Sequence, residues 1–228
     1  MSEFMDIITS DNLSYKQKVL HLAQAAENSE HPVKTTAEFD RLFAAHALDD
    51  MCEGNAPYRP RYICPDYQVF AQNGSEFLRF DKPETLDDLL WGLAALYDNV
   101  PSVTSRPVYV GQLDKIIDPF LEGMTDAEIK PRLRRFLNHI DRTVASGYCH
   151  ANIGPEDTRA GRLLLEVDRE LMNAVPNFTL KYDPEITSDE FMRLAVKTTM
   201  VCSNPAFANH RIHKETYPGE YTVVSCYN

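Results

Sequence analysis

Helix-start signals are the feature that most restricts the fold of this chain. In one segment after another, apolar residues recur every three or four positions, and most of these stripes follow a residue able to cap a helix. The expected helices follow Ser14, Thr35 with Glu38, Thr85, Gly111, Thr125 with Glu128, Glu156 (to Asn173), and Thr187 with Glu190. The threonine–glutamate pairs have capping-box spacing, in which each side chain accepts a hydrogen bond from the other residue's backbone N–H. The sequence therefore predicts a mostly helical chain.

Strand candidates are few and lie late in the chain. Residues 178–182 alternate between two prolines, residues 147–153 give a weaker pattern, and residues 221–225 form the clearest β run. Strands that are buried on both faces need partner strands and covering helices. We therefore expect an α/β fold, mostly helical, whose sheet is incomplete, as in the front part of a larger α/β fold.

Composition and charge restrict the class of protein. The 228 residues are 43% hydrophobic, which suffices for a core, and 34 acidic against 23 basic residues leave a net charge of −11. This balance argues against a nucleic-acid partner or an anionic membrane. The first twenty residues contain no uninterrupted apolar stretch, which predicts neither a secretory signal nor a membrane span. Five cysteines without paired spacing indicate reduced thiols, and we expect a cytoplasmic protein.

Familiar catalytic and metal motifs are missing from the sequence. It contains no GxGxxG, Walker loop, GxSxG elbow or CxxC pair. His210 and His213, with Cys202 nearby, would suit zinc if they lay on a helix. The asparagines and proline within 204–209 indicate a loop instead, so we expect solvated histidines and no metal site.

Other candidate residues each have a structural interpretation. Cys149 and His150 are a thiol–imidazole pair in sequence, but neighbours on a strand point to opposite faces. Asp183 follows a predicted strand, where α/β folds place functional groups, but an aspartate capping a turn is the more common case. Asp114 is typical of an acid in the first turn of a helix. Cys226, after the strongest β run, is by composition a small buried hydrophobe.

Four segments, taken together, change the interpretation of Cys226. They are GQLDKIIDPFL (111–121), PNFTLKYDPE (176–185), CSNPAFANHRIH (202–213) and VVSCYN (223–228). In this order they resemble the glycyl radical enzymes of the pyruvate formate-lyase superfamily. The stretches PSVTSRPVYVGQLD (101–114) and HANIGPEDT (150–158) are most similar to the YjjI-type branch.

The resemblance implies a fold and a chemistry. Such enzymes form a ten-stranded barrel of two half-barrels, and a loop carries a catalytic cysteine into its centre. By position, Cys226 would be the thiyl residue that abstracts a hydrogen atom from a small-molecule substrate. His150, Asp183 and Asn228 are our candidates for substrate binding. The glycyl radical would be installed by a radical S-adenosylmethionine activating enzyme, no cofactor is expected on this chain itself, and a homodimer is compatible with the family.

The chain also departs from the family pattern. Asn228 stands where eliminating branches have a glutamate base, and an amide cannot accept a proton at neutral pH. Tyr227 stands where pyruvate formate-lyase has a second cysteine. No R-V-x-G-[FYW] glycyl motif occurs in the 228 residues.

These departures determine the overall prediction. Residues 1–228 are expected to be one N-terminal segment of the barrel, with a helical lead-in over 1–55 and helices with the first strands over 56–228. The C-terminal glycyl domain is absent from the sequence, so this truncated chain alone would be inactive. The alternatives are a non-catalytic helical interaction or dimerisation protein and a metal hydrolase built on His210, His213 and Cys202.

Overall fold

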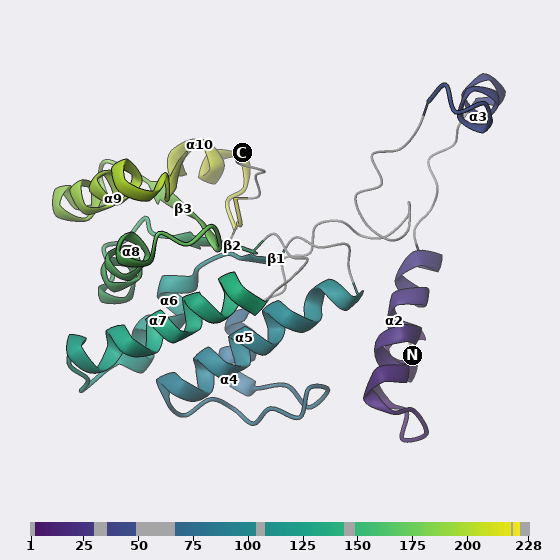
Figure 1. Cartoon of the computed structure of the whole chain (residues 1–228), viewed down its shortest axis with the longest axis horizontal. Coiled ribbons are helices and arrows are strands. Elements are labelled where there is room, and N and C mark those ends of the chain that lie inside the picture. The colour runs from purple at the N-terminus through teal and green to yellow at the C-terminus, as the bar shows by residue number, and fades with distance from the viewer. Residues whose placement is uncertain are drawn as a thin grey trace. The chain divides into compact units, whose positions relative to one another are not determined.

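The computed structural model describes residues 3–29, 36–48, 67–103, 108–143, 149–219 and 221–223 (Figure 1). The chain divides into two compact units, one of residues 1–63 with 100–107 and one of residues 64–99 with 108–228. Among the described residues, no helix is long and apolar enough to cross a membrane.

The first unit consists of helices in its described part. They are α1 (Glu3–Thr9), α2 (Tyr15–Ser29) and α3 (Ala37–Ala44). Helix α2 begins right after Ser14, as predicted. Helix α3 is also confirmed, but its cap is Thr36, whose hydroxyl accepts a hydrogen bond from the Phe39 N–H at 3.2 Å. The sequence placed this cap one residue too early.

The second unit holds the remaining helices. They are α4 (Tyr67–Asn73), α5 (Leu86–Val103, in this unit up to residue 99), α6 (Leu113–Ile117), the 3-10 turn η1 (Asp118–Leu121), α7 (Asp126–Thr143), α8 (Arg159–Leu171), α9 (Asp189–Cys202) and α10 (His210–Thr216). Half of the predicted capping box of α7 is confirmed, because the Thr125 N–H donates to Glu128 Oε2 at 2.8 Å. The Thr125 hydroxyl donates to the same oxygen at 2.7 Å, and the Glu128 N–H bonds to the Thr125 carbonyl. The predicted cap of α9 is wrong. Ser188 caps this helix, and the Thr187 hydroxyl instead donates to the Pro155 carbonyl at 2.9 Å.

Four parallel strands form the sheet of this unit. They are β1 (Val108–Val110), β2 (Cys149–Ile153), β3 (Asn177–Tyr182) and β4 (Ala206–Asn209), arranged in the order β1-β2-β3-β4. Each strand thus pairs with the next one along the chain. Parallel crossovers are nearly always right-handed, so an order that advances in one direction places the connecting helices on the same face. Helices α7, α8 and α9 pack in succession, as this rule requires (Figure 1).

The structure confirms two strand predictions and differs from the sequence analysis in three other places. Residues 178–182 and 147–153 do contain strands, β3 and β2. Strand β1 was not predicted, and the segment predicted as a loop contains strand β4 followed by helix α10. Residues 221–223, the described part of the clearest predicted strand, belong to no strand. Their backbone groups bond to side chains of the sheet instead.

The two faces of the sheet differ in polarity. Because side chains alternate along a strand, Cys149, Ala151 and Ile153 of β2 share a face with Phe178 and Leu180 of β3, and all are buried. The opposite face, called the polar face below, carries Tyr109, His150, Asn152, Thr179 and Lys181, which are buried as well. A buried face with this many polar groups needs internal hydrogen-bond partners.

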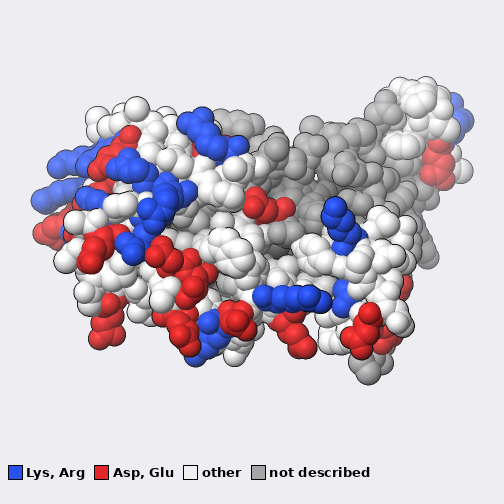
Figure 2. All heavy atoms as spheres, turned by 60° about the horizontal axis from the view of Figure 1, so that its bottom comes forward, with Lys and Arg blue, Asp and Glu red and all other residues white. Residues whose placement is uncertain are grey.

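The outer helices of this unit carry paired charges. Lys130 Nζ of α7 lies 2.7 Å from Glu166 Oε2 of α8, and Arg132 Nε lies 3.0 Å from Asp87 Oδ2 of α5. Figure 2 shows basic and acidic side chains close to one another on the face in view. Exposed pairs of this kind contribute little to stability.

Candidate functional site

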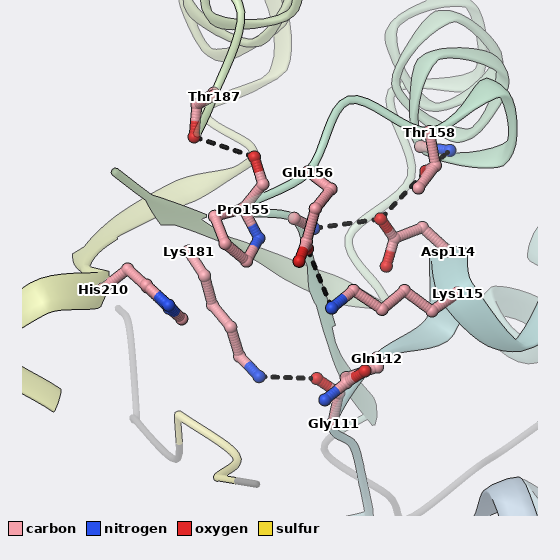
Figure 3. A network of polar contacts seen from close by, with 12 residues as sticks. Gly111, Gln112, Asp114, Lys115, Pro155, Glu156, Thr158, Lys181, Thr187 and His210 are labelled. Atoms are coloured by element: carbon pink, nitrogen blue, oxygen red, sulfur yellow. Dashed lines mark hydrogen bonds and ion pairs between the residues drawn. The ribbon is translucent and has the colours of Figure 1, made fainter. Parts of the chain in front are cut away.

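The residues that come after the four strands gather at one edge of the sheet. Since the strands are parallel, their carboxyl ends lie together, and open α/β sheets bind ligands at this edge. Figure 3 shows the residues after β1 (Gly111 to Lys115), after β2 (Pro155 to Thr158) and after β4 (His210) facing one another. Lys115 Nζ forms an ion pair with Glu156 Oε2 at 2.8 Å, which joins the first two of these loops.

The polar face holds residues 221–223, called the tail segment below. The Asn152 amide makes two hydrogen bonds with one residue: Nδ2 donates to the Val223 carbonyl at 3.2 Å, and the Val223 N–H donates to Oδ1 at 2.6 Å. The Lys181 ammonium donates to the Tyr221 carbonyl at 2.6 Å and to the Gly111 carbonyl at 3.0 Å. Two central strands therefore bind the main chain of the tail segment.

The Tyr221 ring is surrounded by charged and aromatic groups. Lys181 Nζ lies 4.4 Å from the ring centroid, in cation–π geometry. His210 Nδ1 lies 2.6 Å from the Tyr221 hydroxyl, and the His213 ring stacks on Tyr221 at 5.3 Å with an interplanar angle of 16°. Burial lowers the pKa of His210. Both histidines of α10 are thus engaged with Tyr221.

The hypothesis of a metal site finds no support here. Residues 210–216 are helical after all, but Cys202 lies at the end of α9, where its thiol donates to the Thr198 carbonyl at 3.3 Å and lies 3.7 Å from Asp168 Oδ2. Within the part of the chain that the structure describes, no three His, Cys, Asp or Glu side chains are placed to hold a metal ion.

His150 lies on the polar face and is uncharged at neutral pH. Its ring stacks on Tyr109 with centroids 4.7 Å apart, and burial lowers its pKa to about 4. A neutral imidazole has one donor and one acceptor nitrogen, so it can orient a polar substrate group. Cys149 is its neighbour on the strand, and burial raises the pKa of that thiol to about 12. The two side chains alternate across the sheet and cannot act as a nucleophile–base pair.

Asp183 caps a turn at the carboxyl edge. Its Oδ1 accepts from the Glu185 N–H at 2.9 Å and from Arg211 Nε at 3.2 Å. The backbone hydrogen bond from Glu185, followed by the contact with Arg211, lowers the pKa of the carboxyl. The structural interpretation of Asp183 therefore holds, and its role in substrate binding remains a prediction.

Asp114 lies at this edge, although the sequence analysis treated it only as an acid in the first turn of a helix. It is completely buried, and its Oδ2 accepts from the Gly154 N–H and from the Thr158 hydroxyl, both at 3.0 Å. Its Oδ1 has no hydrogen-bond partner among the described residues. Burial raises the pKa of Asp114 to about 6, although both hydrogen bonds act in the opposite direction. The carboxylate links the end of β1 to the loop that starts α8.

Asn152 and Lys181 were also missed as functional residues. Both lie inside segments that carry the family resemblance, HANIGPEDT and PNFTLKYDPE, but neither was given a role. The available signal was a polar residue at an alternate position of a strand predicted to be buried. Cys226 and Asn228 lie outside the described residues, of which Val223 is the last.

Sequence comparison matches the chain to a protein family and to two relatives. The family model described as "Glycyl radical enzyme YjjI-like" matches residues 13–228. An uncharacterized protein of Haemophilus influenzae is 44% identical over 231 residues, covering 100% of this chain and 45% of the relative. An uncharacterized protein YjjI of Escherichia coli is 45% identical over 223 residues, covering 97% of this chain and 43% of the relative. The chain thus spans less than half the length of these relatives.

Proposed function

The chain belongs to the YjjI-like glycyl radical enzymes, and from that premise we propose that it forms the N-terminal part of an enzyme whose hydrogen-abstracting group is the Cys226 thiol. The observation that carries this proposal is the position of the tail segment. Asn152 and Lys181 hold residues 221–223 on the polar face, and Cys226 comes three positions after Val223. The chain that leads to the thiol therefore starts from the polar side of the sheet.

The proposed reaction moves one hydrogen atom at a time. A glycyl radical supplies the unpaired electron: the S–H bond of Cys226 breaks, a C–H bond forms on the glycine, and a sulfur radical remains. That radical then takes one hydrogen atom from a substrate carbon, which restores the S–H bond and leaves the substrate carbon as the radical. A reactive sulfur radical needs a site that excludes water and holds the substrate carbon close.

Three side chains are proposed to bind such a substrate. His150, stacked on Tyr109, offers a neutral donor and acceptor in a buried position. Asp183 lies at the carboxyl edge of the next strand, and Asn228 comes two positions after Cys226. We assign to these three side chains the recognition of a small polar molecule.

The remaining parts of the enzyme would come from outside these 228 residues. The relatives are more than twice as long as the matched region, and the chain itself contains no R-V-x-G-[FYW] motif. A radical S-adenosylmethionine enzyme would create the glycyl radical by removing one hydrogen atom from the glycine. We also propose that the four strands form part of a ten-stranded barrel.

The test uses electron paramagnetic resonance on the full polypeptide after anaerobic activation in D2O. The single α-hydrogen of a glycyl radical splits its signal into a doublet, and a thiol rapidly exchanges its hydrogen for deuterium. Reversible transfer between Cys226 and the glycine would carry deuterium to the radical carbon and collapse the doublet to a singlet. This readout needs no knowledge of the substrate.

We expect the doublet to collapse in the unmodified enzyme. It should also collapse in the control variant Cys202→Ala, which removes a different thiol, the one that lies beside Asp168. In Cys226→Ala the radical should form and the doublet should persist. A doublet that collapses equally in Cys226→Ala, or that persists in the unmodified enzyme, would remove Cys226 from this role.

A further inference from the structure

We propose that Asn152 and Lys181 are positioning residues that fix the chain leading to the Cys226 thiol. This inference rests on the proposed function, because it assigns these two side chains to the delivery of the same sulfur atom. Neither residue needs to touch the substrate for this role. Both act through the main chain of the tail segment.

Asn152 is buried in the sheet, and its side-chain amide contacts Val223 of the tail segment. It lies in the middle of β2, opposite Thr179 of β3, and is 1% exposed. Its amide oxygen and amide nitrogen bond to the N–H and carbonyl of one residue, Val223. A side-chain amide that matches both groups of one residue mimics a neighbouring strand, so it sets the direction of the tail as well as its distance.

Lys181 provides the second anchor, two residues earlier in the tail. It is 2% exposed, and burying a cation is costly unless it has partners. Its ammonium bridges the Gly111 carbonyl, just after β1, to the Tyr221 carbonyl, and it lies over the Tyr221 ring (Figure 3 shows the Gly111 contact). Lys181 therefore ties the tail to the ends of two strands.

Two anchors on one short segment limit the reach of the residues beyond it. A chain advances at most roughly 3.5 Å per residue, so the Cα atom of Cys226, three residues beyond Val223, can lie only about 10 Å from the Cα atom of that anchor. Hydrogen-atom transfer requires the reacting atoms to be held near contact, and a displacement of about 1 Å can cost a hundredfold in rate. Loosening the anchors should therefore slow transfer without preventing formation of the glycyl radical.

The first experiment measures hydrogen exchange of the full polypeptide by mass spectrometry, without activation. Asn152→Ala should speed exchange of the peptide containing the tail segment about tenfold, since the Val223 N–H loses its buried acceptor. Lys181→Met should loosen the same peptide, whereas Lys181→Arg, which keeps the donors, should restore part of the protection.

Two matched control variants remove the same kinds of side chain elsewhere. Asn173→Ala removes a buried asparagine that bonds to Asn138, and Lys130→Met removes a lysine that pairs with Glu166. Neither should change exchange of the tail segment.

Peptides from β2 and β3 serve as internal checks in every variant. Suppose that hydrogen exchange of the tail segment is unchanged in both Asn152→Ala and Lys181→Met while β2 and β3 are still protected. That result would overturn the inference, whether or not Cys226 is the hydrogen-abstracting residue. If Asn152→Ala unfolds the sheet, Asn152→Asp replaces it. Its carboxylate can still accept from the Val223 N–H but repels the Val223 carbonyl, so partial loss of tail protection supports the inference and full protection contradicts it.

The second experiment monitors the collapse of the glycyl doublet in D2O over time. Asn152→Ala and Lys181→Met should form as much radical as the unmodified enzyme but collapse the doublet at least about tenfold more slowly. The two controls should match the unmodified enzyme. Collapse at the unmodified rate, despite a loosened tail, would remove the positioning role. Collapse that persists in Cys226→Ala would instead remove the proposed function, so the two failures are distinguishable.

Discussion

At the scale of single residues, Asp114 is an acid that the fold keeps away from water. Its pKa of about 6, against an ordinary value of 3.8, has burial as its main cause. Between these values the folded chain holds a proton that the unfolded chain has released. The contribution of Asp114 to the free energy of unfolding therefore falls as pH rises from 4 to 6, and its full penalty of roughly 3 kcal/mol is present above pH 6.

Asp114→Asn removes this ionisation while keeping an oxygen that can accept from Gly154 and Thr158. Relative to the unmodified chain, the variant should gain about 3 kcal/mol of stability between pH 4 and pH 7. Urea denaturation at several pH values measures this difference, and comparing the two proteins cancels the other titrating groups. A stability difference that does not change with pH would contradict the prediction.

Gly111 is a second residue that approaches the tail segment closely. A Cβ placed on Gly111 would lie 2.4 Å from the Thr222 hydroxyl oxygen, which is too close for any real contact. Gly111→Ala should therefore displace the tail segment and speed its hydrogen exchange. Gly219→Ala is the matched control, because nothing lies within 4 Å of the added carbon. Equal tail exchange in both variants would show that the approach to Gly111 does not matter.

At the scale of elements, helices could be predicted and short strands could not. The capping box at Thr125 and the apolar stripe of α7 carry local information, so this helix was expected where it lies. Strand β1 has three residues, too few to show alternation, and β4 is built from Ala, Phe, Ala and Asn. Pairing with neighbouring strands decides such segments, since strand propensity depends on context.

The tail segment is the opposite case, because its sequence favours a strand and its described residues form none. Residues 221–225 have the strongest strand composition, but the groups that bind the described part are the Asn152 amide and the Lys181 ammonium. No local pattern encodes partners that lie 40 and 71 positions away. For this reason the sequence indicated Cys226 through resemblance alone and gave no indication of the residues that hold the chain before it.

Thr158 caps helix α8 and connects it to the site. Its hydroxyl accepts from the Gly161 N–H and donates to Asp114 Oδ2, each at 3.0 Å. Thr158→Ala loses a helix cap and a donor to a buried carboxylate, so we expect about 2 kcal/mol of destabilisation. Thr158→Ser keeps the hydroxyl and should recover most of it. Urea denaturation checks both, and equal stabilities of the two variants would show that the hydroxyl has no such role.

At the scale of the whole molecule, the sheet in the described residues stops at β4. Each of the inner strands has two neighbours, whereas in the described sheet β1 pairs with β2 alone and β4 pairs with β3 alone. An open edge strand offers backbone groups to any other strand, including one from a second copy. If the chain is the N-terminal part of a barrel, the rest of the longer protein supplies the next strand.

This reasoning predicts the behaviour of the 228 residues produced alone. They should self-associate with increasing concentration, whereas the full polypeptide, with β4 paired internally, should not associate through this edge. Phe207→Lys places a charge on β4 at a side chain that is 40% exposed, and lysine on an edge strand opposes pairing between copies. Self-association of the 228-residue chain should therefore weaken in this variant.

Ile186→Lys is the matched control, because Ile186 is 45% exposed but belongs to the loop between β3 and α9 and not to strand β4. Sedimentation velocity over a concentration series measures all three proteins. If Ile186→Lys weakens association as much as Phe207→Lys does, general surface hydrophobicity is responsible and the open edge is not. If the 228 residues remain monomeric at every concentration, β4 needs no further strand, and the proposal that this sheet is part of a larger barrel loses its physical basis.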